Sequence, residues 1–415
     1  MIELREIVET KERVILVGVQ FDENSPAEES LDELAELART AGAEVAGCLI
    51  QNREAVHSAT YIGKGKLLEL KELLWETESS GIICDDELTS VQIRNLEQEL
   101  DCKVIDRTLL ILDIFAARAV SGEGKIQVEL AQLRYRASRL VGLRNSLSRL
   151  GGGIGTRGPG EKKLEMDRRL IRERISRLKK ELEDVEQHRE LIRSQRKNSN
   201  LKVAALVGYT SAGKSSLENA LTGADILEDA MLFSTLDTTT RALELEGAQK
   251  ILLTDTVGFI RKLPHHLIEA FKSTLEEAKY ADIILHVVDA SNPQMEVQMH
   301  VVYETLRQLG VEGKPVITLF NKQDKLESPS KFRDFHADYS IPVSAKTGQG
   351  LEKLKSVLTE IIRKEQIYIE RVFPFAEAGK IQLIRKNGQL LEEAYEAEGI
   401  RVKAYVPKAI YGKLI

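Results

Sequence analysis

Residues 208–215 have the types and spacing of a phosphate-binding loop. They read Gly-Tyr-Thr-Ser-Ala-Gly-Lys-Ser, between an apolar run at 202–207 that predicts a strand and a following run that predicts a helix. Glycines let backbone N–H groups turn toward phosphate oxygens, and a helix N-terminus adds positive charge. We expect Lys214 to reach the β- and γ-phosphates of a nucleotide and Ser215 to place its hydroxyl on Mg²⁺. The residues predicted to line this loop are Gly208, Tyr209, Thr210, Ser211, Ala212, Gly213, Lys214, Ser215 and Ser216.

A second motif, Asp255-Thr-Val-Gly258, follows the apolar run at 251–254. A carboxylate at the end of a strand can hold Mg²⁺ through a water molecule, and this is the role we expect for Asp255. The N–H of Gly258 can contact a γ-phosphate, a contact that exists only with the triphosphate. The motif therefore predicts a site that distinguishes nucleoside triphosphate from diphosphate.

Two further motifs indicate which base is bound. Asn321-Lys322-Gln323-Asp324 follows the apolar run at 317–320, and Asp324 can accept two hydrogen bonds from guanine N1 and N2, which adenine cannot donate. Hydrogen bonds to a charged group contribute about 1.5–3 kcal/mol each, so the pair predicts a strong preference for guanine. The N–H of Ala345 would meet guanine O6. The residues predicted at the base are Asn321, Lys322, Asp324, Ser344, Ala345 and Lys346.

A hydroxyl-rich stretch at residues 233–241 lies between these motifs and predicts a switch segment. We expect Thr235 to bind Mg²⁺ together with Ser215 and Asp255, with Thr239 as the alternative, and we place Phe233 in the nucleotide-binding set. The predicted catalytic residues are Lys214, Thr235 and Gly258. Phe259 occupies the position at which Ras-like enzymes carry a water-orienting Gln, and a phenyl ring cannot orient water. We therefore expect Phe259 to pack and the intrinsic rate of hydrolysis to be low.

The elements that carry these motifs alternate between strand and helix patterns over residues 201–364. This alternation predicts a Ras-like phosphate-loop GTPase domain. Residues 1–120 alternate in the same way and predict a separate N-terminal parallel α/β domain. Residues 365–415 predict a small C-terminal α+β domain, with strands at 367–373 and 400–406. The fold class is therefore a multidomain α/β protein.

Residues 121–200 predict a basic helical hairpin. The glycine-rich stretch 151–160 is incompatible with a helix and separates two helical patterns, at 127–150 and 161–196, while 197–200 resembles a linker. Between Lys125 and Lys180 there are 16 Lys and Arg against 5 Asp and Glu, in a chain whose net charge is −6. Such concentrated positive charge favours a polyanionic partner for this segment.

Composition narrows the class of protein. The chain has 415 residues, 42% of them hydrophobic and 30% charged, without a run of about 18 apolar residues. From the first residues, Met-Ile-Glu-Leu-Arg-Glu, we expect no signal peptide. Three isolated cysteines favour reduced thiols rather than a disulfide framework or a metal site. We expect a cytoplasmic monomer without a membrane span, and leave peripheral membrane association open.

With these motifs in place, the whole chain resembles the HflX family of ribosome-associated GTPases, within the translation-factor-related class. The stretches that carry the resemblance are Tyr-Ile-Gly-Lys-Gly-Lys at 61–66, the glycine-rich loop with its flanks at 149–161, Asp-Thr-Val-Gly-Phe-Ile-Arg-Lys-Leu-Pro at 255–264, and the guanine motifs. The resemblance implies GTP and GDP as ligands, Mg²⁺ as cofactor and GTP-dependent binding to the large ribosomal subunit. Well-studied members of the family split stalled or idle ribosomes, and the resemblance implies the same activity here. Some members are credited with ATP hydrolysis as well.

The chain departs from the family pattern at several positions. Ser211 stands where the family usually has Asn, which helps to hold an activating K⁺ in related GTPases, so K⁺ stimulation stays open. Ser216, Glu218 and Thr238 replace the usual Thr, Phe and Pro. Neither Ser216 nor Glu218 is a required phosphate ligand, and we expect nucleotide binding to survive. The loss of the proline at Thr238 is expected to loosen the switch segment.

Three functional hypotheses remain. The leading one is a GTPase whose cycle controls binding to the large ribosomal subunit, with the basic hairpin on ribosomal RNA and the loop Gly63–Lys66 as a second candidate contact. The second is a GTP-gated RNA-binding module that acts off the ribosome. The third is a protein that binds GTP without hydrolysing it. Ribosome co-sedimentation and a phosphate-release assay distinguish them.

Overall fold

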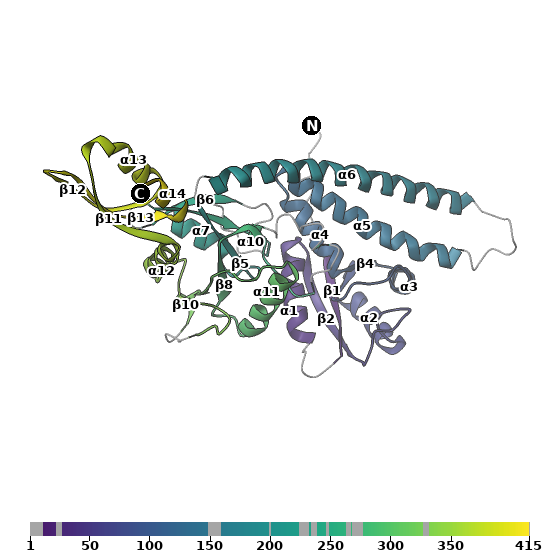
Figure 1. Cartoon of the computed structure of the whole chain (residues 1–415). Coiled ribbons are helices and arrows are strands. Elements are labelled where there is room, and N and C mark those ends of the chain that lie inside the picture. Colours follow the sequence, from purple (N-terminus) through teal and green to yellow (C-terminus); the bar gives the residue numbers. More distant parts are fainter. Residues whose placement is uncertain are drawn as a thin grey trace, which may run out of the picture. The chain divides into compact units, whose positions relative to one another are not determined.

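The computed structural model describes residues 11–21, 27–147, 159–198, 201–223, 232–233, 239–245, 249–262, 267, 277–326 and 332–414. The chain divides into two compact units. The first comprises residues 1–183, 231–233 and 262–271, and the second comprises 184–230, 234–261 and 272–415 (Figure 1). Residues 234–261, which include Gly258, therefore belong to the second unit, and the short stretches on either side of them in the sequence belong to the first.

A four-stranded parallel sheet forms the centre of the first unit, in the order β2-β1-β3-β4. Six successive residues of β1, from Val14 to Val19, are buried, which is typical of a parallel strand covered on both faces. The parallel α/β architecture predicted for the N-terminal region is present. Its elements are β1 (Arg13–Gln20), α1 (Ala27–Thr40), β2 (Glu44–Asn52), α2 (Lys64–Glu76), β3 (Gly81–Cys84), α3 (Ser90–Leu100), β4 (Lys103–Asp106) and α4 (Arg107–Arg118).

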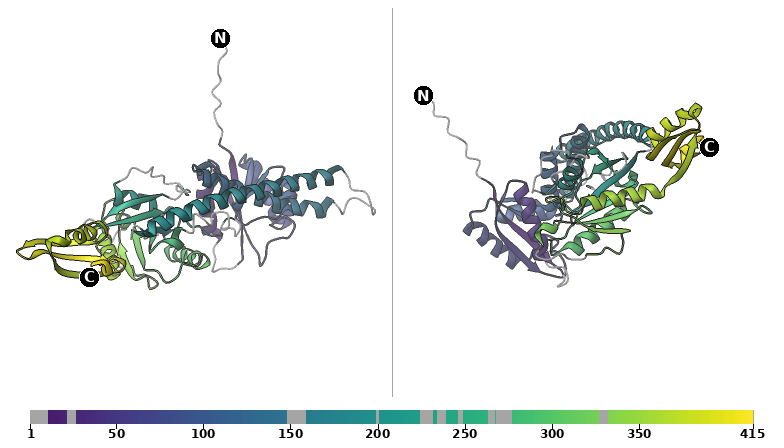
Figure 2. Two further views of the ribbon diagram at one scale, coloured as in Figure 1. Left: turned by 45° about the horizontal axis from the view of Figure 1, so that its top comes forward. Right: turned by 90° about the vertical axis from the view of Figure 1, so that its left-hand side faces the viewer.

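Two long helices, α5 (Gly122–Leu147) and α6 (Pro159–Asn198), form the predicted hairpin and lie side by side in Figures 1 and 2. Arg174 of α6 joins them through two hydrogen bonds to the carboxylate of Glu129, at 2.7 and 2.8 Å. The predicted loop was too long, because α6 begins at Pro159, a residue that the first turn of a helix tolerates. The predicted linker was also wrong at Lys197 and Asn198, which continue the helix.

A six-stranded sheet forms the centre of the second unit, in the order β10-β9-β8-β5-β7-β6, with only β6 antiparallel to its neighbour among the described strands. Its main core consists of aliphatic side chains from one face of the sheet, Leu206, Leu285 and Leu319 among them. The elements are β5 (Lys202–Gly208), α7 (Lys214–Thr222), β6 (Thr240–Glu244), β7 (Lys250–Asp255), α10 (Glu277–Tyr280), β8 (Ile283–Asp289), α11 (Met295–Gln308), β9 (Val316–Asn321), η2 (Gln323–Lys325), β10 (Tyr339–Pro342) and α12 (Leu351–Lys364).

The C-terminal segment is an antiparallel sheet in the order β11-β13-β12, with its own core around Phe373 and Val402. The strand β12 and the helix α14 were not predicted, β12 because its glutamates obscure the apolar alternation. The elements are β11 (Gln366–Phe373), η3 (Phe375–Glu377), α13 (Ala378–Asn387), β12 (Gln389–Glu396), β13 (Gly399–Pro407) and α14 (Lys408–Leu414). Among the described residues of the whole chain, no helix is long and apolar enough to span a membrane.

Candidate functional site: a guanine-nucleotide site at the carboxyl ends of β5, β7 and β9

The phosphate-binding loop connects the end of β5 to the start of α7, as the motif predicts. Gly213 caps α7 with φ of 92°, in the left-handed region that favours glycine. A Cβ added at Gly213 would lie 2.4 Å from Nδ2 of Asn321, so this position cannot accept a side chain without a shift. The fold therefore places the loop backbone directly against the first guanine motif.

Lys214 is buried, and its ammonium group closes the phosphate-binding loop. Nζ donates to the carbonyl oxygens of Tyr209 at 2.9 Å and Gly208 at 3.2 Å. Burial lowers the pKa of Lys214 to about 8, while Asp255 acts in the opposite direction. An anion beside this ammonium would favour its charged form, as expected for a side chain that contacts phosphate oxygens.

The predicted magnesium ligands Ser215 and Asp255 lie in contact. Ser215 Oγ donates to Asp255 Oδ2 at 2.8 Å, and the backbone N–H of Thr256 donates to Oδ1 at 2.9 Å. The described residues contain no group of three His, Cys, Asp or Glu that could hold a metal unaided. A hydroxyl and one carboxylate fit Mg²⁺, which binds oxygen, keeps several waters and usually takes its other ligands from substrate phosphates.

Gly258 and Phe259 lie directly on the phosphate-binding loop. The N–H of Thr210 donates to the carbonyl oxygen of Phe259 at 2.8 Å, and the N–H of Phe259 donates to that of Gly208 at 3.1 Å. A Cβ on Gly258 would lie 2.8 Å from Cα of Thr210. Phe259 is buried, which agrees with the packing role expected for it. The predicted γ-phosphate sensor is thus adjacent to the predicted phosphate cradle.

Tyr209 contributes a contact that the motif does not predict. Its hydroxyl accepts a hydrogen bond from the backbone N–H of Arg261 at 2.8 Å, three residues after Gly258. The side chain of Tyr209 therefore binds the backbone of Arg261, while the backbones of Gly208 and Thr210 bind that of Phe259. No spacing rule indicates this contact, since it depends on how β5 and β7 pair.

The two guanine motifs meet at the end of β9. Asn321 Oδ1 accepts from the N–H of Ala345 at 3.0 Å, and Ser344 Oγ donates to Asp324 Oδ1 at 2.6 Å. This hydrogen bond lowers the pKa of the exposed Asp324 carboxyl, which therefore stays an acceptor at neutral pH. Lys322 takes a left-handed backbone conformation, with φ of 62°, and Nζ donates to Asp289 at 2.6 Å. Lys346 is exposed at the same loop.

The structure describes only some of the residues predicted for the switch segment. Thr235 and Thr238 lie outside the described residues, so the role of Thr235 stays a prediction. Phe233 is grouped with the first unit, where its ring meets Phe115 of α4 edge to face, with centroids 4.7 Å apart. The alternative threonine, Thr239, donates from Oγ1 to Oε2 of Glu218 at 2.9 Å. Burial, followed by the charge of Asp255, raises the pKa of Glu218 to about 7.

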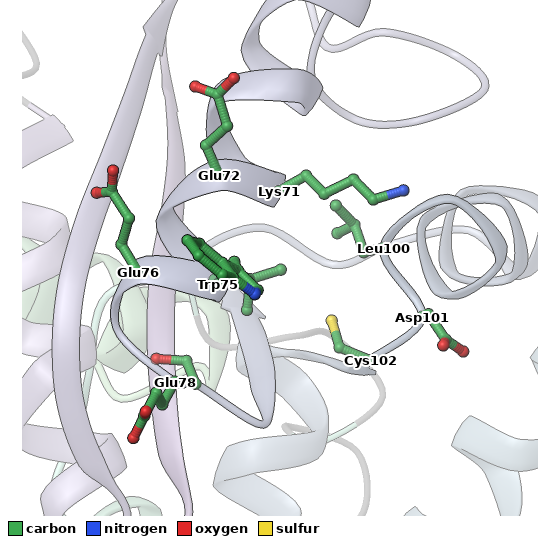
Figure 3. Close-up of a pocket in the computed structure, with 10 residues that line it drawn as sticks. Lys71, Glu72, Trp75, Glu76, Glu78, Leu100, Asp101 and Cys102 are labelled. Carbon is green, nitrogen blue, oxygen red and sulfur yellow. The ribbon is translucent and has the colours of Figure 1, made fainter.

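A hollow on the first unit lies apart from these motifs in the sequence. It is formed by the end of α2 and the end of α3, with Trp75, Leu100 and Cys102 among its lining residues (Figure 3). Trp75 has 84% of its surface exposed. None of the predicted nucleotide-binding residues lines this hollow.

Comparison with known proteins shows to which family the chain belongs. Three family models match successive parts of the chain: a GTP-binding GTPase N-terminal model at residues 28–116, a GTP-binding GTPase middle-region model at 118–196, and a model described as 50S ribosome-binding GTPase at 203–322. GTPase HflX of Lacrimispora saccharolytica is 63% identical over 414 residues, which cover 100% of this chain and 98% of that protein. The chain belongs to the HflX family of GTPases.

Other HflX proteins are also similar over most of their length. GTPase HflX of Caldanaerobacter subterraneus subsp. tengcongensis is 50% identical, with 99% of this chain and 95% of that protein covered. GTPase HflX of Escherichia coli is 42% identical, with 85% and 84% covered. A crystal structure of a GTP-binding protein from Sulfolobus solfataricus in complex with GDP is 27% identical, with a TM-score of 0.44 over 85% of this chain and 99% of that one. As an HflX GTPase, the chain binds guanine nucleotides and hydrolyses GTP.

Proposed function

We propose that this HflX protein binds the large ribosomal subunit in its GTP form, through ribosomal RNA contacted by the α5–α6 hairpin, and splits stalled or idle ribosomes. The observation that carries the proposal is the charge of the hairpin, which is strongly basic in an acidic chain. Exposed basic side chains project along α6, with Arg172, Arg177, Lys179 and Lys180 among them. The description of the matched family model, 50S ribosome-binding GTPase, supports the same partner.

The site residues have distinct proposed roles in hydrolysis. Lys214 binds the β- and γ-phosphates, and the N–H of Gly258 binds the γ-phosphate. Ser215, Thr235 and, through water, Asp255 would hold Mg²⁺, which when bound neutralises charge on the phosphate oxygens. Asp324 and Ala345 select guanine.

Phe259 supplies no group that could orient the attacking water. We therefore propose that the basal rate is low and that the ribosome raises it, in a protein that acts in the cytoplasm. The decisive measurement is GTP hydrolysis with and without large ribosomal subunits. A basal rate unchanged by subunits would contradict the proposal.

A charge variant tests whether the hairpin is the RNA contact. The triple variant R177Q/K179Q/K180Q removes three exposed charges from α6, and K353Q/K386Q/K408Q removes three exposed charges from the second unit. Phosphate contacts release counterions, with a log–log salt slope of roughly −0.7 to −0.9 per contact. The hairpin variant should show weaker, less salt-dependent co-sedimentation with large subunits in a non-hydrolysable GTP analogue. The control variant should match the unmodified protein.

Replacement of residues 151–160 by a Gly-Ser linker tests the tip of the hairpin. Basal hydrolysis should persist, since the loop lies outside the predicted GTPase domain, whereas subunit-stimulated hydrolysis and splitting should fall sharply. R157A should give a milder loss. If the unmodified protein binds protein-free RNA but does not co-sediment with ribosomes, the alternative of a GTP-gated RNA-binding module off the ribosome is favoured instead.

A further inference from the structure

Glu218 is a buried carboxylate that no nucleotide motif explains. It lies in α7, three residues after Ser215, and its side chain has 0% of its surface exposed. One oxygen, Oε2, accepts the hydrogen bond from Thr239, and the other, Oε1, is buried without a hydrogen-bond partner among the described residues. Burial of a carboxylate is costly unless its interactions compensate. Glu218 therefore calls for a role beyond filling space.

Thr239 is held from a second side as well. Its carbonyl oxygen accepts a hydrogen bond at 3.0 Å from the N–H of Asp255, whose carboxylate in turn accepts the hydrogen bond from Ser215. Three hydrogen bonds close a ring, which we call the circuit: they join Glu218 to Thr239, Thr239 to Asp255 and Asp255 to Ser215. The helix α7 contains both Ser215 and Glu218 and completes it. This circuit joins the helix after the phosphate-binding loop, the end of the hydroxyl-rich stretch and the end of β7.

The position of Thr239 in the chain gives the circuit its significance. Thr239 directly precedes β6, and residues 233–238 before it contain Thr235, the hydroxyl residue predicted to respond to the γ-phosphate. A segment that rearranges between two states needs a fixed point where it rejoins the fold. Thr239 is anchored by side chain and backbone together, and Glu218 is the only side chain that holds its hydroxyl within the described part of the chain.

We propose that Glu218 is a positioning residue for GTP hydrolysis, which grips the Thr239 hydroxyl and so fixes the end of the switch stretch beside Asp255. The role is independent of ribosome binding. Its loss should impair the response to the γ-phosphate more than binding of GDP, because GDP makes no γ-phosphate contact.

Four single variants and one double variant test this proposal without ribosomes. E218L removes the acceptor while keeping a buried side chain of similar length, and T239V removes the donor with little change in shape. E218Q keeps an oxygen that can accept from Thr239 and is the conservative variant. T222V is the matched control, because Thr222 in the same helix donates to the backbone carbonyl of Glu218 at 2.8 Å rather than to its side chain.

The readouts are kcat, KM and the ratio of affinities for a non-hydrolysable GTP analogue and for GDP. We expect E218L and T239V each to lower kcat and the affinity ratio by about 10-fold, the effect of one hydrogen bond lost in a buried site. GDP affinity should stay within about 2-fold of the original. E218Q should restore most of the loss and T222V should lose nothing. The double variant E218L/T239V should be no worse than either single variant, since both remove one interaction.

Circular dichroism and GDP binding show whether each variant folds, and T239V is informative even if E218L does not fold. An unchanged affinity ratio in T239V would overturn the proposal. Equal losses of GTP analogue and GDP in T239V and E218L would also overturn it, because they would make Glu218 a packing residue of α7. Additive losses in the double variant would show that the two residues act separately.

Discussion

Nδ2 of Asn321 donates a hydrogen bond to the carbonyl oxygen of Ala212 at 2.9 Å. Because Oδ1 of the same amide accepts from Ala345, one side chain at the end of β9 joins the phosphate-binding loop to the loop that would contact guanine O6. Asn321 is buried, so both contacts lie away from solvent. The nucleotide site is therefore braced between its two ends by a residue that need not touch the nucleotide.

Removal of this brace should weaken every guanine nucleotide alike. N321A leaves the Ala212 carbonyl and the Ala345 N–H without their partner, at a cost of about 1–3 kcal/mol for each unsatisfied group. We expect affinities for GTP and GDP to fall together by about 10-fold or more, measured by calorimetry. A selective loss of GTP alone would contradict the bracing role and assign Asn321 to the γ-phosphate response.

Base selectivity should change when Asp324 is replaced. In D324N the new amide can donate to the 2-oxo group of xanthine, whereas its remaining oxygen cannot accept two hydrogen bonds from guanine. GTP affinity should fall about 10-fold or more and xanthosine triphosphate should become the better ligand. S344A is the control: it removes the hydrogen bond that holds the Asp324 carboxylate, together with the one that Ser344 Oγ accepts from the N–H of Thr347 at 3.2 Å, but keeps the carboxylate itself. It should weaken GTP binding without altering base preference. Unchanged GTP affinity in D324N would place the base elsewhere.

K214A and S215A should both lose GTP hydrolysis, the first through phosphate binding and the second through Mg²⁺ binding. K214A should abolish hydrolysis and weaken the triphosphate most, because the ammonium is the cation predicted to contact the β- and γ-phosphates. S215A should abolish hydrolysis and raise the Mg²⁺ concentration needed for tight GTP binding, which a magnesium titration with a fluorescent nucleotide measures. Circular dichroism checks that both variants fold. Turnover that persists in a folded K214A protein would show that the site has been misplaced.

His286 should make stability depend on pH. It is buried in β8, and burial lowers its pKa to about 4, although Asp334 acts in the opposite direction. The unfolded chain binds a proton near pH 6.5, so the contribution of the neutral ring is present above that pH and is lost as the pH falls toward 4. Between pH 7.5 and 5.0 the unfolding free energy should fall by about 2 kcal/mol more in the unmodified protein than in H286Q. Urea denaturation at the two pH values measures this difference, and equal falls in both proteins would count against it.

The contrast between Lys214 and Glu218 shows how far sequence reasoning reaches. Lys214 belongs to a local pattern whose geometry follows from eight consecutive residues, and the structure places it between strand and helix as expected. Glu218 also stood out in the sequence, but its partner Thr239 is 21 residues away, and only the pairing of β6 with β7 brings the two together. The same limit applies to Tyr209 and Arg261, which are 52 residues apart.

Errors in the predicted elements have local physical causes. The strand β12 was missed because Glu392, Glu393 and Glu396 break the apolar alternation, and the structure shows that nearby cations accompany them, Lys403 at 2.7 Å from Glu392 and Arg385 at 2.6 Å from Glu393. Glu392 pairs in register with Lys403 and Glu393 with Val402, so the two charges lie on opposite faces of the strand and each is accompanied by its own cation. The start of α6 was misplaced because a proline was treated as the end of a loop rather than as the first residue of a helix.

Trp75 is the only tryptophan in the sequence, and it stands almost fully in solvent beside the hollow of α2. The protein thus contains a single intrinsic tryptophan fluorophore at a known position, distant in sequence from every nucleotide motif. Tryptophan fluorescence from this chain therefore comes from one exposed side chain, and its wavelength and intensity report on the surroundings of the end of α2. A change in that emission when GTP replaces GDP would show that the surroundings of α2 respond to the bound nucleotide, and it can be measured without attaching a dye.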